Sequence, residues 1–326
     1  LSATRLENWV RCPYAYFMHY VLGVGALDEP ADEDGITPLA RGSLAHGILD
    51  RFLTESIDAG DLPSPDVAWG PTHHERLGRI CEEEFTLVED RGLTGRPLLW
   101  QRDGGRLRRA LSEFLLHDDE RRSGDLLTPA AAEMAFGFDD KEPLVLQLAD
   151  GRTLRFRGSI DRVDRAVGGG LVVTDFKTGK KQYYSKVSED SPDVNGQYLQ
   201  LPLYGLAARE RLAAPDADIE VRYWFLTDGG RVVGHPLSAP VLERFDHVLA
   251  TIIDGIEQGL FPARPPESSY GIGCDYCDPD DLGTKSGLEH WGRKRLDPRL
   301  DDYRRLIGDL PDDGPVAIIE LGGTDG

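Results

Sequence analysis

Gly158-Ser-Ile-Asp161, followed by Val172-Val-Thr-Asp175-Phe-Lys177-Thr-Gly179, is the part of the sequence that decides the fold. Residues 171–173 make both faces of the second segment apolar, which indicates a buried strand. Asp175 and Lys177 are two positions apart, so their side chains project from the same face of that strand. The two segments predict neighbouring β-strands with a carboxylate and an ammonium group at the end of a buried one.

These charges need partners. A carboxylate and an ammonium group at a buried strand end are costly in isolation, and a divalent cation held by two carboxylates would remove that cost. Asp161 would supply the second carboxylate from the preceding strand, and Mg²⁺ favours few carboxylates together with water and phosphate oxygens. Such a metal activates water, and a fixed lysine orients it or neutralises the developing oxyanion. Taken alone, Asp175-Phe-Lys177 is more often an ordinary strand-end salt bridge.

Outward from this centre, the residues up to about 128 show mainly helical periodicity. Thr4 and Glu7 have the spacing of a capping box, which predicts a helix start. Further helices are expected through Gly42–Leu53 and around residues 77–88, where apolar residues recur on one face.

The pattern after Pro129 is different. Short β-rich runs are separated by Asp-Gly or Gly-rich turns, which is typical of a meander. The expected strands are Glu133–Phe138, Leu144–Leu148, Thr153–Arg165, Leu171–Phe176, Ile219–Leu226 and Arg231–Leu237, and the expected helices are Asn195–Leu212 and Pro240–Gly259. This order predicts an α/β fold with one mixed sheet flanked by helices and a helical N-terminal subdomain. We divide the chain into a helical part (1–128), an α/β core (129–262) and a cysteine-containing tail (263–326).

Composition narrows the function classes. The sequence is 40% hydrophobic and 29% charged, as in an ordinary globular protein. It lacks an apolar run of the ~20 residues that cross a bilayer, it has no signal peptide, and it begins with Leu1, so we expect an excised fragment of a cytoplasmic protein without a membrane segment. It also contains no phosphate-binding Gly-x-x-x-x-Gly-Lys-Ser/Thr loop, so the fragment is not itself an ATP motor.

The net charge of −20 weighs against nonspecific binding to phosphate backbones, although a basic groove can coexist with an acidic surface. Candidate basic patches are Arg106, Arg108 and Arg109; Arg121 and Arg122; Lys177, Lys180 and Lys181; and Arg293, Lys294 and Arg295. Each patch is alternatively a solvated surface.

The ordered motifs resemble the RecB-like PD-(D/E)XK nucleases, in which a helical His is followed by Gly-x-x-Asp, Asp-x-Lys and Gln-x-x-x-Tyr. The corresponding segments here are Arg41-Gly-Ser-Leu-Ala-His46, Gly158-Ser-Ile-Asp161, Asp175-Phe-Lys177 and Gln200-Leu-Pro-Leu-Tyr204. The resemblance covers nearly the whole chain and implies a restriction-endonuclease-like fold.

The resemblance also implies individual roles. His46, Asp161 and Asp175 would be metal ligands for Mg²⁺ or Mn²⁺, with His46 in an outer position, and Lys177 would be the catalytic lysine. Gln200 and Tyr204, one helical turn apart, would face the site and contact DNA, and Gln197 replaces Gln200 if the helix register differs by a turn. Glu133 matches a frequently acidic position and would help to organise metal or water, or else is a solvated glutamate at a strand start.

The cysteines suggest a second site. Cys12 and the pair Cys274 and Cys277 resemble parts of the iron–sulfur staple of AddB-like members, in which four thiolates hold a [4Fe–4S] cluster. The position of the fourth thiolate is Gly283. Cys81 is a candidate replacement but fits a buried core position better. A non-Cys ligand such as His290, a zinc site, or a lost cluster whose remaining cysteines simply pack are the alternatives.

The leading hypothesis is a metal-dependent deoxyribonuclease, most plainly an exonuclease. It would act on DNA ends or single strands in recombination and repair, beside a helicase module in the same polypeptide or complex. A noncatalytic DNA-binding or assembly domain on a degenerate nuclease scaffold is the alternative. A zinc-binding interaction module built around Cys274 and Cys277 would leave the Asp-x-Lys strand unexplained.

Overall fold

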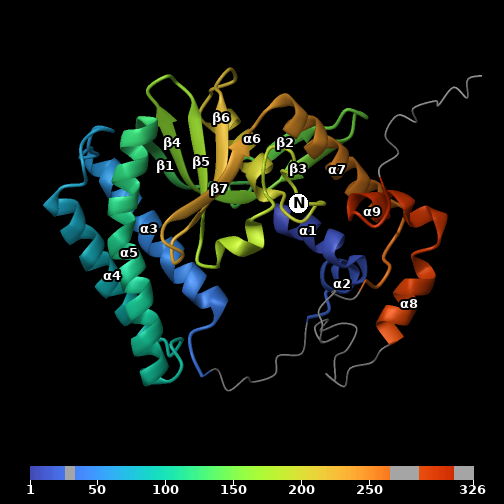
Figure 1. The fold of residues 1–326 in the computed structure, drawn as a ribbon, viewed down its shortest axis with the longest axis horizontal. Coiled ribbons are helices and arrows are strands. Elements are labelled where there is room, and N and C mark those ends of the chain that lie inside the picture. Colours follow the sequence, from blue (N-terminus) through green and yellow to red (C-terminus); the bar gives the residue numbers. More distant parts are fainter. Residues whose placement is uncertain (26–33, 265–285, 312–326) are drawn as a thin grey trace, which may run out of the picture.

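A computed structural model describes residues 1–25, 34–264 and 286–311, and its centre is a five-stranded mixed sheet (Figure 1). The strand order is β1-β4-β5-β6-β7, with β5 and β6 parallel and the other neighbours antiparallel. The strands are β1 (Leu127–Phe136), β4 (Gly158–Ala166), β5 (Leu171–Lys177), β6 (Ile219–Phe225) and β7 (Arg231–Pro236). A separate hairpin is formed by β2 (Leu144–Gln147) and β3 (Thr153–Phe156). The expected mixed sheet is thus confirmed.

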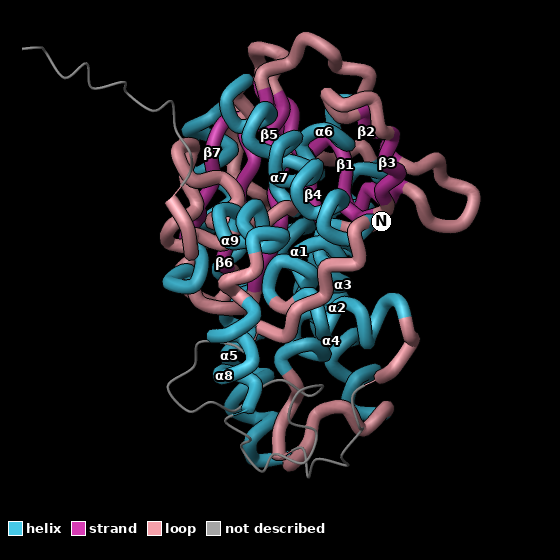
Figure 2. The backbone as a smooth tube through the Cα atoms, turned by 90° about the vertical axis from the view of Figure 1, so that its right-hand side faces the viewer, coloured by secondary structure: helices cyan, strands magenta, loops and turns pink. Residues whose placement is uncertain are grey.

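Helices cover both faces of this sheet. One group packs beside it as a helical layer, which Figure 1 shows around β1, and consists of α3 (Pro38–Ala59), α4 (Pro71–Asp90) and α5 (Pro97–Asp125). The other side carries α1 (Ala3–Arg11), α2 (Pro13–Tyr16), η1 (Phe17–Val21), α6 (Gln200–Arg211), α7 (Ala239–Glu257) and α9 (Asp301–Leu306). The remaining elements are η2 (Lys181–Tyr184), α8 (Ser286–Lys294) and η3 (Pro298–Leu300). Viewed from that side, α7 and α9 lie in front of the strands (Figure 2).

Two hydrophobic cores result from this layering. Phe176 and Trp224 of the sheet pack with α3, α4 and α5 in one core, where Phe114 contacts both rings. On the opposite face, Val173 and Tyr223 belong to a larger core with α1, α6, α7 and α9. Alternate residues of β5 therefore point into different cores. Asp175 and Lys177 share the parity of Val173, which directs them toward the α6 side.

Several boundaries differ from the sequence-based expectations. Ser2 rather than Thr4 caps α1, because its side chain accepts the Arg5 N–H. The expected strand Thr153–Arg165 is broken at Arg157, whose N–H donates to the Leu1 carbonyl outside the ladder.

Two further expectations, the start of the first strand and the start of the helix after β5, are wrong. β1 begins at Leu127, six residues before the expected start, so Glu133 lies within the strand. α6 begins at Gln200 instead of Asn195, because Val194, Asn195 and Gly196 have positive φ angles that a helix does not allow. No described helix is long and apolar enough to cross a membrane.

Candidate active site

The separation of β4 and β5 opens the site. Their ladder ends at the pair Arg162 and Thr174, and the carboxylate of Asp161 lies just beyond that pair. Its Oδ2 accepts the backbone N–H of Phe176 at 2.6 Å. Asp161 is therefore fixed by the neighbouring strand while its other oxygen remains available, and the residue is 8% exposed.

His46 reaches Asp161 from the helical layer. It lies on α3, and its Nδ1 is 3.0 Å from Asp161 Oδ1. Burial by itself would lower the pKa of His46, but the hydrogen bond and the charge of Asp161 outweigh it and raise the pKa above its ordinary value. The edge of the ring faces Phe176, with the ring centroids 6.3 Å apart. The helical His and the first acidic residue of the sequence pattern are thus in direct contact.

Asp175 and Lys177 form a buried ion pair. Lys177 Nζ lies 2.5 Å from Asp175 Oδ2 and donates to Gln200 Oε1 at 3.0 Å. Burial would lower the pKa of Lys177, but the charge of Asp175 is stronger and raises the pKa to about 12. The ammonium group is therefore held charged. Asp175 Oδ2 is buried and makes no hydrogen bond of normal geometry to a described residue.

The two aspartates also influence each other. Burial, followed by the nearby charge of Asp175, raises the pKa of Asp161 to about 6. Two buried carboxylates with one lysine leave an excess of negative charge, which favours a cation. Among residues 1–25, 34–264 and 286–311, no group of three or more His, Cys, Asp and Glu side chains forms a ready metal site. A cation here would need further ligands from water or substrate.

Glu133 lies next to Asp161 on the adjacent strand. It falls between the pairs Ala132–Arg162 and Met134–Ile160 of the β1–β4 ladder, and its φ is +39°. Asp161, Glu133 and Tyr204 all line one pocket of about 580 Å³. Glu133 is therefore not a strand-start residue, as the sequence suggested, but an exposed carboxylate facing a hollow beside the buried pair.

α6 closes the site from the side opposite α3. Gln200 is its first residue and contacts Lys177, whereas Gln197 precedes the helix. Tyr204 lies one turn later, 9% exposed, with its ring 6.3 Å from that of Phe136. Burial and the charges of the two aspartates raise the pKa of Tyr204, so its hydroxyl stays protonated.

Sequence reasoning missed Glu7. Its side chain is 6% exposed, and its Oε1 accepts the backbone N–H of Leu199 at 2.7 Å, directly before α6. Burial raises the pKa of Glu7, while the charge of Lys177 lowers it and that of Asp175 raises it. The available signal was an acidic residue within the apolar stripe of residues 6–10, which the capping-box interpretation assigned to the helix start instead.

The cysteine site is only partly within the described residues. Cys12 is 8% exposed at the junction of α1 and α2. Cys274, Cys277 and Gly283 lie outside the described residues. Cys81 belongs to the core beneath α4, and burial raises the pKa of its thiol to about 11, which confirms the core assignment.

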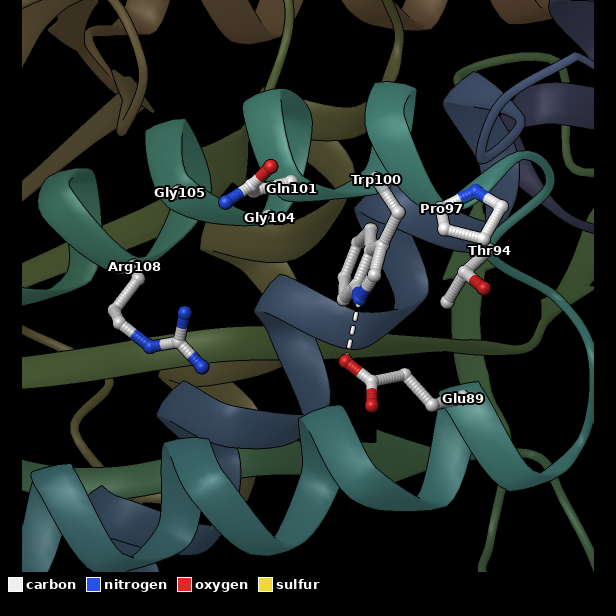
Figure 3. A pocket seen from close by; sticks show the side chains of 8 residues that line it. All are labelled: Glu89, Thr94, Pro97, Trp100, Gln101, Gly104, Gly105 and Arg108. Carbon is white, nitrogen blue, oxygen red and sulfur yellow. Dashed lines mark hydrogen bonds between the residues drawn. The ribbon is translucent and has the colours of Figure 1, made fainter.

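A further hollow lies between α4 and α5, away from these groups (Figure 3). Trp100 forms its floor and donates its indole N–H to Glu89 Oε1 at 2.5 Å. A Cβ on Gly104 would stand 3.1 Å from the Trp100 ring, so glycine keeps this hollow open. None of the sequence-predicted site residues lines it.

Comparison with known proteins supports the geometric assignment. A family model described as the PD-(D/E)XK nuclease superfamily matches residues 1–281. The chain is similar to an ATP-dependent helicase/deoxyribonuclease subunit of Clostridium perfringens, with 28% identity over 214 residues, 63% of this chain and 17% of that protein. Proteins of the same name from Clostridium tetani (25% identity over 195 residues) and Acetivibrio thermocellus (28% over 192 residues) each match over 56% of this chain and 16% of their own length. The chain thus spans less than a fifth of these relatives. With a strand-end Asp-x-Lys pair, a contacting helical His and a family match over most of its length, the chain belongs to the PD-(D/E)XK nuclease superfamily.

Proposed function

We propose that this chain is the deoxyribonuclease module of a larger DNA-processing protein and that Asp161 and Asp175 hold a Mg²⁺ or Mn²⁺ ion. The carrying observation is the convergence at one strand end of two buried carboxylates, a contacting histidine and a charged lysine. When bound, the ion would activate water and stabilise charge on the scissile phosphate.

The residues fit a hard divalent cation. Asp175 Oδ2 is a buried oxygen without a hydrogen bond of normal geometry to a described residue, and Asp161 Oδ1 contacts a histidine that can turn or change its protonation. Mg²⁺ usually takes one or two carboxylates and keeps several water or phosphate ligands. The small number of protein ligands therefore agrees with the chemistry of this ion.

The other groups position the reaction. Lys177 carries a permanent charge at the strand end and is steered by Gln200, so it is placed to neutralise the developing oxyanion or orient the attacking water. His46 fixes the orientation of Asp161. Tyr204 stays neutral and can donate a hydrogen bond from the wall of the pocket that it shares with Asp161.

The biological setting is inferred from the relatives. They are named as subunits that combine helicase and deoxyribonuclease activity, and this chain matches less than a fifth of each. We infer a helicase module as the partner, in the same polypeptide or complex, and DNA ends or single strands as substrate. Exonuclease action is the corresponding expectation.

The purified chain is tested with end-labelled linear and circular single-stranded DNA in MgCl₂, MnCl₂ or EDTA. Cleavage of linear DNA that requires the metal and is lost in Asp175→Asn supports the proposal, and sparing of the circle supports exonuclease action. The matched control is Asp246→Asn, an acid of α7 outside the site. Equal cleavage by the wild type and Asp175→Asn would refute the assignment.

A further inference from the structure

A second pocket adjoins the catalytic strand end and has a different composition. Its volume is about 690 Å³, and it lies between α3, α5, the loop after β5 and the turn between β6 and β7. Its basic and aromatic lining residues are Arg41, Arg106, Arg109, Lys180 and Tyr183. Two basic clusters that are distant in the sequence therefore meet here.

The pocket is continuous with the active site through α3 and β5. Thr178 follows Lys177 directly and lines the pocket, while Arg41 lies five residues before His46 on the same helix. A Cβ on Gly42 would be 3.7 Å from Thr178 Oγ1, so the helix and the loop are in close contact. A strand lying in this pocket would lead directly to Lys177.

The local charge contrasts with the whole chain. Arg106, Arg109 and Lys180 are exposed and form no ion pair with a described residue, and Arg41 Nε has no hydrogen bond within the described part of the chain. The acids in the lining are Asp103, which pairs with Arg102 at 2.8 Å, and Glu113. Positive charge is thus concentrated on one surface of a chain whose net charge is −20.

The loop that carries the aromatic residue is held in place. Tyr183 is 67% exposed, and its carbonyl accepts the hydroxyl of Tyr198 at 2.8 Å. At the start of the loop, the Thr178 carbonyl accepts the Thr227 hydroxyl at 2.9 Å, and the Lys181 N–H donates to Asp228 at 3.1 Å. An exposed tyrosine on an anchored loop provides a preorganised face for a base.

We propose that this pocket binds the single-stranded DNA next to the scissile phosphate, with the arginines and Lys180 contacting phosphates and Tyr183 stacking on a base. The inference rests on the proposed nuclease function. A single strand is favoured over a duplex, because stacking on Tyr183 requires an unpaired, accessible base. Phosphate contacts without base-specific groups also imply little sequence preference.

Binding is measured by fluorescence anisotropy with a labelled oligothymidylate of ~20 nucleotides in EDTA, where cleavage does not interfere. Arg106→Gln/Arg109→Gln is expected to bind about tenfold more weakly, and the slope of log K against log salt should fall by about 1.4, since each phosphate contact on a single strand contributes roughly 0.7. The matched control is Arg91→Gln/Arg165→Gln, which removes the same charge at exposed positions outside the pocket and should bind as the wild type does.

Stacking is tested separately. Tyr183→Ala should weaken binding by about tenfold, and Tyr183→Phe should restore it, since stacking on a ring does not need the hydroxyl. The proposal is wrong if the pocket variant and its control bind equally well, or if a blunt hairpin duplex binds as tightly as the single strand. These outcomes are independent of cleavage. A wild-type chain that does not cut in MgCl₂ but loses binding in the pocket variant would refute the nuclease function and retain the pocket.

Discussion

The ion pair between Asp175 and Lys177 allows stability and chemistry to be separated. Asp175 is 4% exposed, and the Lys177 side chain is 19% exposed. Removing one member of a buried pair costs ~3–5 kcal/mol, because it leaves a charge without a partner. Since Lys177 retains some solvent contact, Lys177→Met should lower the free energy of unfolding by about 3 kcal/mol, at the low end of that range.

The double variant Asp175→Asn/Lys177→Met should recover most of this loss. Both charges are then absent, and neutral groups of similar size occupy the space, so the cost relative to the wild type should be about 1 kcal/mol. The coupling energy in the double-mutant cycle should therefore be about 2 kcal/mol or more. Cleavage should be lost in all three variants, because chemistry needs both groups.

Urea unfolding followed by circular dichroism, in EDTA at pH 7.5, gives the four free energies. EDTA matters because a bound cation would itself stabilise the native state by mass action. Additive losses, with a double variant as unstable as the sum of the two single variants, would show that the pair is not energetically coupled. The structural account of the site would then be wrong even if both residues were catalytic.

Three further predictions concern the carboxylate site, the sheet and the helix packing. Asp161→Asn should abolish cleavage yet stabilise the metal-free chain by roughly 1–3 kcal/mol above pH 6, because a folded-state pKa raised to about 6 means that burying the charged form is unfavourable; this gain should vanish below pH 4, where the carboxyl is protonated in both states, and a constant difference across pH would contradict it. Arg162→Met should lower stability in urea by ~3–5 kcal/mol, since the guanidinium bridges two buried aspartates at 2.7 Å each, and a loss below about 1 kcal/mol would argue against the network. Gly255→Ala should destabilise by ~1–3 kcal/mol, because the new methyl group would overlap the Trp9 ring, whereas Gly78→Ala, in an open and exposed helix position, should be neutral or stabilising.

The sheet was predictable because its signals are local. Apolar residues on both faces of β5 indicated a buried strand, and the structure places it between two cores. Boundaries set by backbone geometry were not readable in the same way. The left-handed residues Val194 and Asn195 have no Gly-like signature, so the sequence pattern extended α6 five residues too far toward the N-terminus.

The site divides along the same line. His46, Asp161, Asp175 and Lys177 could be named from their order in the sequence, because each belongs to a short motif. The role of Glu7 could not, since its hydrogen bond to Leu199 joins positions 192 residues apart and depends on how α1 packs against α6. The acidic partner of Arg162 on α5, Asp118, was equally inaccessible, because that contact exists only once the helix lies on the sheet.

The acidic net charge can be reconciled with a DNA substrate through the distances involved. At physiological ionic strength the Debye length is ~8 Å, so exposed charges farther away contribute little to binding at a given pocket. Much of the surface acid is also paired: Glu55 and Glu83, for example, form ion pairs with Arg51 and Arg79 on the outer face of the helical layer. The arginines beside the catalytic strand end have no such partners among the described residues. A phosphate in that pocket therefore experiences the local excess of positive charge, whereas the −20 total acts mainly at low salt, where the screening length grows to ~30 Å and the whole surface repels DNA. The sign of the net charge alone thus said little about the substrate, because the distribution of unpaired charges around the site determines what binds there.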